Sequence, residues 1–297
     1  MAPAPSTRAP AEPALVGFQR GVSVAAPQSA AIPSLGANAA PAEPGPPAPV
    51  LMDQRRSAPE GALKPEVPLS VRDEALARLA AGVSLQGLSL IGVDLQEVDF
   101  NGASLSRLDL RRAKLQRANL AGVQAAEIQL EGADLTDASV EGADLTRANL
   151  SRATVTNTRF DNATLSGANL QRLAGDAPSF LRSKLQGADL REARLPGADF
   201  DDAELRNASI AKALLTGSRF VRANLAGANL RESKLGDANF AHANLEGADL
   251  RDADLTRVNA HGASRKSAKI TPAQLKNLLE HDTESDSTPR KDGSRHD

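Results

Sequence analysis

The sequence predicts an all-β solenoid, in which the chain coils around one axis with four walls and about 20 residues per coil. Three observations support this: a strict five-residue period, a small residue at a fixed place in each period, and phenylalanines at multiples of 20. Residues five apart drift round every face of a helix and alternate between the faces of a strand. A chain that turns one corner every five residues keeps them all inside.

The five-residue repeat runs from residue 83 to residue 262, and in 131–150 it reads EGADL-TDASV-EGADL-TRANL. A bulky apolar residue closes each pentad. From Leu85 to Leu255 there are 35 pentads, of which 24 close on Leu and six on Phe. The residue two places earlier is Ala in 22 of the 35. Because the frame never shifts, these two positions define the predicted core.

The phenylalanines indicate how many pentads make one coil. Six of the seven lie in the repeat: Phe100, Phe160, Phe180, Phe200, Phe220 and Phe240. With four pentads per coil they all fall on one wall, and the last five occupy consecutive coils. The spacing of paired strands, ~4.8 Å, suits offset ring stacking.

The small–Asp/Asn–Leu pattern is clearest at 118–120, 133–135, 168–170, 228–230 and 248–250. This pattern resembles the pentapeptide repeat proteins. The resemblance implies a right-handed quadrilateral β-helix of about 8–9 coils of 20 residues, with the closing Leu or Phe and the small residue inside. It implies no activity, because the family carries many functions on one scaffold.

The composition divides the chain into five segments. Residues 1–68 hold 14 of the 18 prolines and are predicted to be disordered, because they lack apolar periodicity. Residues 69–82 are an N-terminal cap helix, 83–262 the β-helix, 263–281 a C-terminal cap helix and 282–297 a disordered tail. Two interpretations of 1–68 remain: a flexible linker, or an uncleaved leader for a specialised bacterial secretion system. No part of the segment has the pattern of a cleaved signal peptide.

The first helix has both of its end signals. Ser70 is the expected N-cap, with Asp73 and Glu74 in the first turn, and Gly82 is the expected left-handed residue at the C-terminal end. An apolar face of Val71, Leu76, Leu79 and the alanines would cover the first coil.

The second helix begins with Thr271 as N-cap, Pro272 as first residue and Gln274 completing a capping box. Ile270 would pack on Leu275 as a hydrophobic staple. This helix is expected to close the last coil. The alternative is that it pairs two copies of the chain as a homodimer.

Two places in the repeat are weak. Ala125 replaces a closing Leu, and Gly175 and Pro178 stand at core positions. Either that wall bulges while the coil continues, or five residues loop out. Phe160 and Phe180 favour continuity. We expect the solenoid to be weakest at 175–178, because a Leu and a ladder donor are missing there.

Charged residues lie outside and supply the candidate protein-interaction surface. A basic group at 107–117 precedes an acidic group at 127–144. The candidate residues are Arg107, Arg111, Arg112, Glu131, Asp137 and Glu141. The alternative is a solvated face that keeps the solenoid soluble.

No catalytic, cofactor or metal site is predicted. The chain has no Cys, and its four His residues lack metal-ligand spacing. A core filled by Leu and Phe is expected to leave no cavity for a small-molecule ligand. No segment approaches the ~18 apolar residues of a membrane span.

The sequence therefore predicts a non-enzymatic scaffold that binds another protein, either in the bacterial cytoplasm or as an exported effector. The alternative is a DNA mimic that protects or inhibits a topoisomerase such as gyrase. DNA as long as the repeat, roughly 42 Å, carries about 25 negative charges. Residues 83–262 hold 24 Asp/Glu and 21 Lys/Arg, a net of −3. This near-neutral charge disfavours mimicry, and nucleic acid is not an expected partner.

Overall fold

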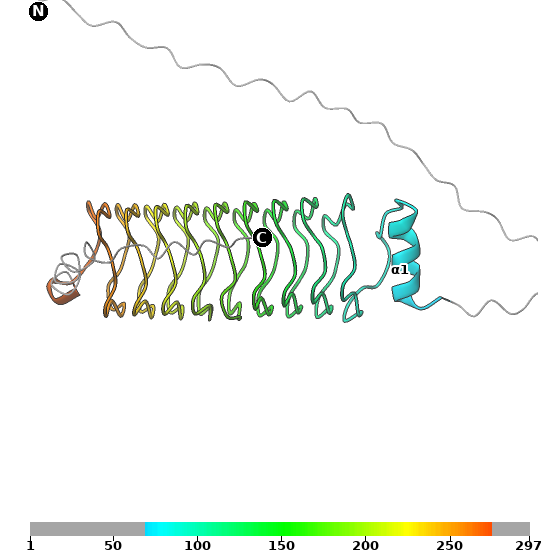
Figure 1. Ribbon diagram of the computed structural model, residues 1–297, viewed down its shortest axis with the longest axis horizontal. Helices are drawn as coiled ribbons and strands as arrows, with labels where there is room; N and C mark the ends of the chain where they lie inside the picture. Colours follow the sequence, from blue (N-terminus) through cyan, green and yellow to red (C-terminus); the bar gives the residue numbers. More distant parts are fainter. Residues whose placement is uncertain (1–68, 275–297) are drawn as a thin grey trace, which may run out of the picture. The chain divides into compact units, whose positions relative to one another are not determined.

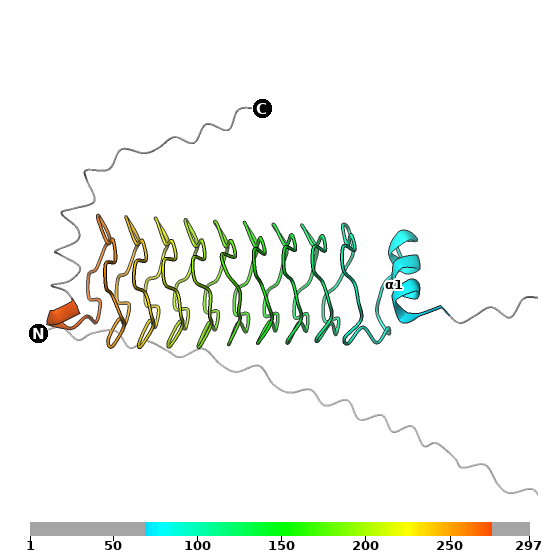
Figure 2. The same ribbon diagram turned by 60° about the horizontal axis from the view of Figure 1, so that its bottom comes forward.

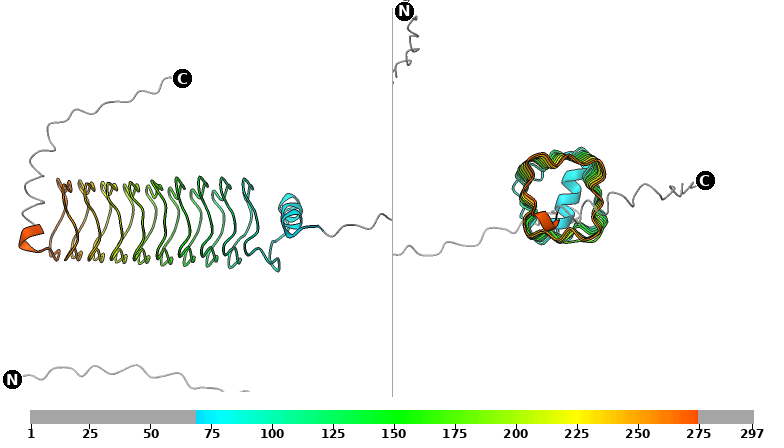
Figure 3. Two further views of the ribbon diagram at one scale, coloured as in Figure 1. Left: turned by 90° about the horizontal axis from the view of Figure 1, so that it is seen from below. Right: turned by 90° about the vertical axis from the view of Figure 1, so that its left-hand side faces the viewer.

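The computed structural model describes residues 69–274, which form an elongated coil with α1 (Val71–Ala80) at its N-terminal end (Figure 1). Viewed end-on, the coils superpose as a square, and α1 lies across the opening (Figure 3). We name the walls by their closing residues: wall 1 (85, 105, 125 and so on), wall 2 (90, 110), wall 3 (95, 115) and wall 4 (100, 120). The corner between walls 2 and 3 is called corner 2–3, and the others are named likewise.

The walls are held together by a parallel ladder with a register of 20. Every bridge joins residue i to residue i+20, from Asp94–Lys114 through to Asp249–Lys269. From the pentad that closes on Leu95 onward, each pentad contributes one bridging residue, so the walls are shorter than ordinary strands. The right-handed quadrilateral β-helix predicted from the resemblance is confirmed.

The backbone hydrogen bonds explain the polar residue of each pentad. In the pentad that closes on Leu135, the N–H of Asp134 donates to Ala113 O (3.0 Å) in the preceding coil, and that of Leu135 to Thr154 O (2.8 Å) in the next. The N–H of Thr136 has no ladder partner and donates instead to Oδ1 of Asp134 (3.0 Å). An Asp or Asn before the closing residue therefore satisfies the corner N–H, as predicted for this position.

The second residue of each corner has a positive φ, near +58° at Arg112 and +66° at Gly132. A hydrogen bond such as Ala113 N–H to Leu110 O (3.0 Å) closes the turn. This left-handed conformation explains why Gly recurs in the repeat unit Glu-Gly-Ala-Asp-Leu.

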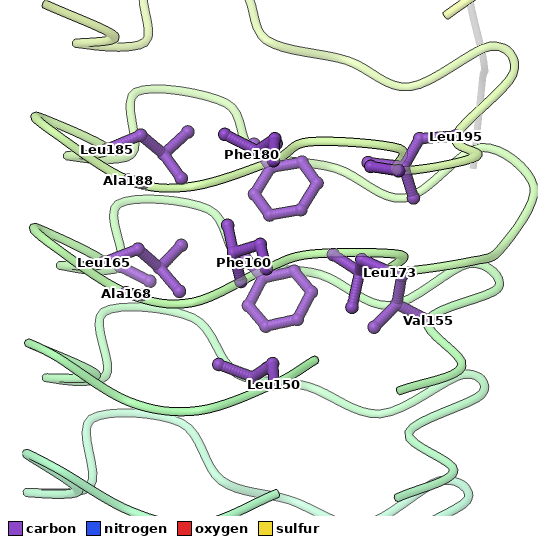
Figure 4. Packing of buried hydrophobic residues seen from close by; sticks show 14 of the residues in the cluster. Leu150, Val155, Phe160, Leu165, Ala168, Leu173, Phe180, Leu185, Ala188 and Leu195 are labelled. Atoms are coloured by element: carbon purple, nitrogen blue, oxygen red, sulfur yellow. The ribbon is translucent and has the colours of Figure 1, made fainter. Parts of the chain in front are cut away.

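The core is the row of closing residues together with the small residues two places earlier, nearly all of them buried from Leu105 to Ala260. All six repeat phenylalanines lie on wall 4. From Phe160 to Phe240 the rings stack with centroids 4.6–4.9 Å apart and planes within 5°. Figure 4 shows Phe160 and Phe180 one above the other inside the coil. The prediction of four walls with a single phenylalanine wall is confirmed.

Helix α1 has the predicted end signals, because Ser70 Oγ accepts from Asp73 N–H (3.1 Å) and Gly82 has φ +64°. The helix also supplies hydrogen bonds to the open end of the ladder. Arg78 donates to Ser84 O (3.3 Å) and Gln86 O (3.2 Å), and Arg72 donates to Asp94 O. These carbonyls have no preceding coil to pair with, and Figure 2 shows α1 beside the first coil.

Only part of the predicted apolar face of α1 is confirmed. Ala75 is buried and Leu76 and Leu79 pack against the core, but Val71 is 40% exposed, and Ala77 and Ala80 are exposed too.

The coil extends beyond the predicted boundary at 262, because Asn244 pairs with Ser264 and Asp249 with Lys269. The five-residue frame continues here, with Ala263 and Ala268 at the small position and Ile270 at a closing position, packed against the core. A helical turn begins at 272–274.

Gln274 connects this turn to the last coil. Its Oε1 accepts from Thr271 N–H (3.0 Å), as the capping box predicts, and its Nε2 donates to Leu250 O (2.8 Å) and Ala253 O (2.7 Å). The staple partner Leu275 and the rest of the predicted helix and its dimer contact (275–281) lie outside the described residues. The predicted segments 1–68 and 282–297 lie outside them too.

The coil continues through the two places predicted to be weak. Gly175 N–H donates to Arg194 O (3.0 Å), and Ser179 N–H donates to Thr158 O (2.9 Å). The expectation that Pro178 removes a ladder donor is wrong. At this position of a pentad the N–H makes the turn hydrogen bond, as Ala113 N–H does to Leu110 O, and it takes no part in the ladder. No five-residue loop forms.

The space that a closing Leu would fill at positions 175 and 125 is filled by the side chain two residues earlier. These side chains are Leu173 and Val123, at the position where most pentads carry Ala, and both are buried. Figure 4 shows Leu173 pointing into the interior on the side of Val155 and Leu195. The order small-then-large is thus reversed in these pentads, so the core stays filled.

Candidate interaction surface

The six residues predicted as an interaction surface lie on four different corners. Arg107 is at corner 1–2, and Arg111, Arg112 and Glu131 are at corner 2–3. Asp137 is at corner 3–4 and Glu141 at corner 4–1. Charges that are close in the sequence are therefore separated around the coil, and the structure brings only the three residues of corner 2–3 together.

Most of these charges instead pair with a residue in the neighbouring coil or across a corner. Arg107 Nε is 2.9 Å from Glu127 Oε2, and Arg159 Nη2 is 2.9 Å from Glu141 Oε1. Asp137 accepts a hydrogen bond from Asn157 (3.0 Å). These side chains are exposed, so each pair contributes little to stability.

An Asp-Leu-Arg sequence recurs three times along the edge of wall 2, at 109–111, 189–191 and 249–251. In each, the arginine donates back to the aspartate across the corner; in the last, Nε is 2.8 Å from Oδ1 and Nη2 is 2.6 Å from Oδ2. The side-chain hydrogen bond from Arg251 lowers the pKa of Asp249 to about 2, and that from Arg111 lowers the pKa of Asp109.

These pairs predict acid sensitivity. The folded pKa of Asp249 lies below the ordinary value near 3.9, so its stabilisation is complete above pH ~4 and is lost as pH falls toward about 2. We expect the melting temperature of the Arg251→Met variant to lie below that of the wild type at about pH 6. Near pH 2 the two melting temperatures should approach each other. Thermal melts across this range test it, and a gap that stays constant with pH would contradict the assignment.

Corner 2–3 is the most basic part of the described surface. It carries eight Lys/Arg and four Asp/Glu between residues 91 and 252, a net of +4. The cations are Arg111, Arg112, Arg152, Arg172, Arg191, Lys212, Arg231 and Arg251. Sequence reasoning found only Arg111 and Arg112 of this ridge, because the other members follow in later coils, 20 residues apart.

A groove of about 400 Å³ lies beside this ridge, on wall 3. Its lining comes from three successive coils: the corner column Arg172, Glu192 and Lys212, and the wall column Ala174, Arg194 and Leu214. A second hollow, of about 590 Å³, lies at the N-terminal end under α1, where Leu79, Val83 and Val98 face Asp99 and Ser104. The expectation of no ligand-sized space is therefore wrong for the outside of the described coil.

Within residues 69–274, no group of three or more His, Asp or Glu side chains lies close enough together to hold a metal ion. No helix in the same range has the length and apolar character needed to cross a membrane.

The chain matches the family model for pentapeptide repeats in eight copies, at residues 81–117, 113–152, 143–173, 183–220 and 233–264. No curated protein matches the sequence significantly. Among solved structures, the chain is similar to HetL of the cyanobacterium Nostoc sp. strain PCC 7120, a protein involved in heterocyst differentiation regulation. The identity is 29%, the match covers 66% of this chain and 93% of HetL, and the TM-score is 0.41.

Two further similar structures are more distant in sequence. A trypsin-treated form of QnrB1, a plasmid-mediated fluoroquinolone resistance protein, is 16% identical, with 63% of this chain and 95% of QnrB1 covered and a TM-score of 0.36. Rfr23 of the cyanobacterium Cyanothece 51142 is 18% identical, with 67% and 98% covered and a TM-score of 0.19. The family match spans more than half of the chain and agrees with the four-walled coil. This protein belongs to the pentapeptide repeat family.

Proposed function

We propose that this protein is a non-enzymatic scaffold that binds another protein through the face formed by wall 3 and corner 2–3. The observation that carries the proposal is that basic side chains and an exposed apolar side chain lie together on that face. It combines the basic ridge with Leu214, which is 38% exposed. The other large exposed apolar residues of the described chain, Leu69, Val71, Val83 and Ile91, all lie near α1.

The division of labour within each pentad supports a scaffold role. Nearly all closing and small residues from Leu105 to Ala260 are buried and hold the coils together, while most of the remaining positions face outward. Outward residues can therefore change without loss of the fold, which leaves them free to select a partner. Pentapeptide repeat proteins are generally interaction scaffolds rather than enzymes.

The role of residues 1–68 as an export address is a further part of the proposal, supported only by their proline-rich composition. DNA mimicry is the weaker alternative. Its acidic charges would have to be uncompensated, whereas the three aspartates of wall 2 (Asp109, Asp189 and Asp249) each bind an arginine.

Site-specific photo-crosslinking tests the scaffold proposal. A photoreactive residue would replace one exposed residue on each of three walls of the full chain: Thr154 on wall 3, Lys184 on wall 1 and Asn229 on wall 2. In lysate of the source organism, we expect one dominant crosslinked protein from position 154 and much weaker crosslinking from the other two. The partner, once identified, should then bind when purified.

Equal crosslinking from all three walls, or none from any, would contradict the proposal. Crosslinking to a topoisomerase, followed by its inhibition or protection by the chain, would favour mimicry instead.

A further inference from the structure

The wall 3 groove departs from the composition of the repeat in a way that the fold does not require. The residue before each closing position faces outward, and from Ser84 to Asp254 there are 35 such positions. Only two of them are apolar, Ala174 and Leu214. Both lie in the same column, one coil on either side of Arg194, because Ala174 bridges to Arg194 and Arg194 bridges to Leu214.

Neither Ala174 nor Leu214 can accept the corner N–H, as Asp or Asn does at this position. An Asp or Asn here accepts the corner N–H, as Asp134 does from Thr136, but an alkyl side chain has no acceptor. Leu214 is also partly exposed to water. The corner N–H of Asp176, two residues after Ala174, donates instead to Thr156 Oγ1 of the preceding coil (3.4 Å). Ala174 and Leu214 thus place apolar surface on either side of Arg194.

Arg194 differs from the other arginines at the same outward position. Arg159 pairs with Glu141 (2.9 Å), and Arg219 pairs with Asp201. Arg194 has no ion pair with any residue in 69–274. The acid lining the same groove, Glu192, is bound by Arg172 (2.8 Å), whose hydrogen bond lowers the pKa of Glu192. The guanidinium of Arg194 is therefore left for an external anion.

The groove is open for a chain to enter. At the neighbouring corner 3–4, no side chain in the same coils is longer than that of Asp176; the others are Ala177, Pro196, Gly197, Thr216 and Gly217. The lining holds three cations and one acid. From Ala174 to Leu214 the groove spans two coil spacings, ~10 Å, which an extended peptide covers in about three residues.

Resting on the proposed function, we propose that this groove binds an acidic, partly apolar extended segment of the protein partner. A carboxylate would form a bidentate pair with Arg194, and an apolar side chain would cover Ala174 and Leu214. Arg172 and Lys212 would add longer-range attraction from the ridge. Nucleic acid fits less well, because Glu192 lines the groove and Ala174 and Leu214 offer no phosphate contact.

Fluorescence anisotropy with the full chain tests this inference. The probe is a short fluorescein-labelled peptide in which Glu and Leu alternate, and its control has Gln in place of every Glu. We expect the acidic probe to bind, and Arg194→Gln to weaken it at least about ten-fold through loss of the charged pair. Leu214→Ser should weaken binding by a smaller factor. Lys184→Gln removes an exposed cation from the same pentad position on wall 1 and should leave the Kd unchanged. All variants should keep the wild-type melting temperature.

The outcomes separate this inference from the scaffold proposal. If Arg194→Gln binds the acidic probe as tightly as wild type, the groove assignment is wrong, even if position 154 still crosslinks a partner. If the probe binds wild type and not Arg194→Gln while no wall crosslinks a protein, the groove assignment stands and the scaffold proposal fails. A single-stranded oligonucleotide that binds more tightly than the peptide, and depends on Arg194, would overturn the acidic-peptide assignment.

Discussion

Replacing Phe200 with Ala should lower the free energy of unfolding by about 3–5 kcal/mol. Phe200 is the middle of five stacked rings, with centroids 4.8 Å from Phe180 and 4.9 Å from Phe220. The neighbouring coils are held at the ladder spacing by hydrogen bonds, so they cannot collapse into the space left behind. Both the buried area of the ring and its two ring contacts are lost. Guanidinium denaturation of the full chain, followed by circular dichroism, measures the change.

A pair of milder variants separates ring stacking from volume. Phe200→Leu introduces the most common closing residue but removes both ring contacts. Phe100→Leu makes the same change where the next two residues on wall 4 are Leu120 and Val140, so no ring contact is lost. We expect Phe200→Leu to cost more than Phe100→Leu by about 1–3 kcal/mol, the sum of two stacking contacts. Equal costs would show that the rings act only as filling.

The second large effect is expected at the reversed pentad that contains Leu173 and Gly175. Leu173→Ala should cost about 2–5 kcal/mol, because Leu173 fills the space that a closing Leu fills elsewhere. Gly175→Leu, which restores the usual closing residue, should also destabilise. A Cβ at position 175 would lie 2.5 Å from Thr156 N and 2.6 Å from Val155 C, both of which are backbone atoms. Denaturant midpoints at constant m-value give both changes.

The double variant tests whether the two positions share one volume. Leu173→Ala with Gly175→Leu has the usual order of a small and then a large residue. We expect it to be less destabilised than the sum of the single variants, by at least about 1 kcal/mol. Additive costs, or a stabilising Gly175→Leu, would show that the Leu at 173 does not replace the closing side chain.

The sequence by itself determined the fold, the coil length and most of the core. Contacts in a solenoid join residue i to residue i+20, so a frame read from Leu and Ala places every closing residue without knowledge of distant segments. The phenylalanines could be placed on one wall for the same reason. The end signals of α1 were also readable, because Ser70 and Gly82 act on their immediate neighbours.

Only the tertiary structure decided how the weak pentad is repaired and how the ends are covered. At Pro178 the sequence could not show which hydrogen bond a missing N–H removes, and the lost bond belongs to the turn rather than to the ladder. At the N-terminal end, Arg72 and Arg78 reach carbonyls of the first coil, a result that depends on the angle at which α1 crosses it.

The outer surface also depended on the tertiary structure. Reading charges along the chain grouped Glu131 with Asp137 and Glu141, although the coil turns a corner after each pentad and sends them to three corners. When outward residues are instead compared at intervals of 20, Ala174, Arg194 and Leu214 fall on one wall. Even so, the periodicity does not show that Arg194 has no ion pair within residues 69–274 while Arg219 pairs with Asp201. That difference depends on where the neighbouring coils place a carboxylate within reach of each long side chain, and only the folded coil fixes it.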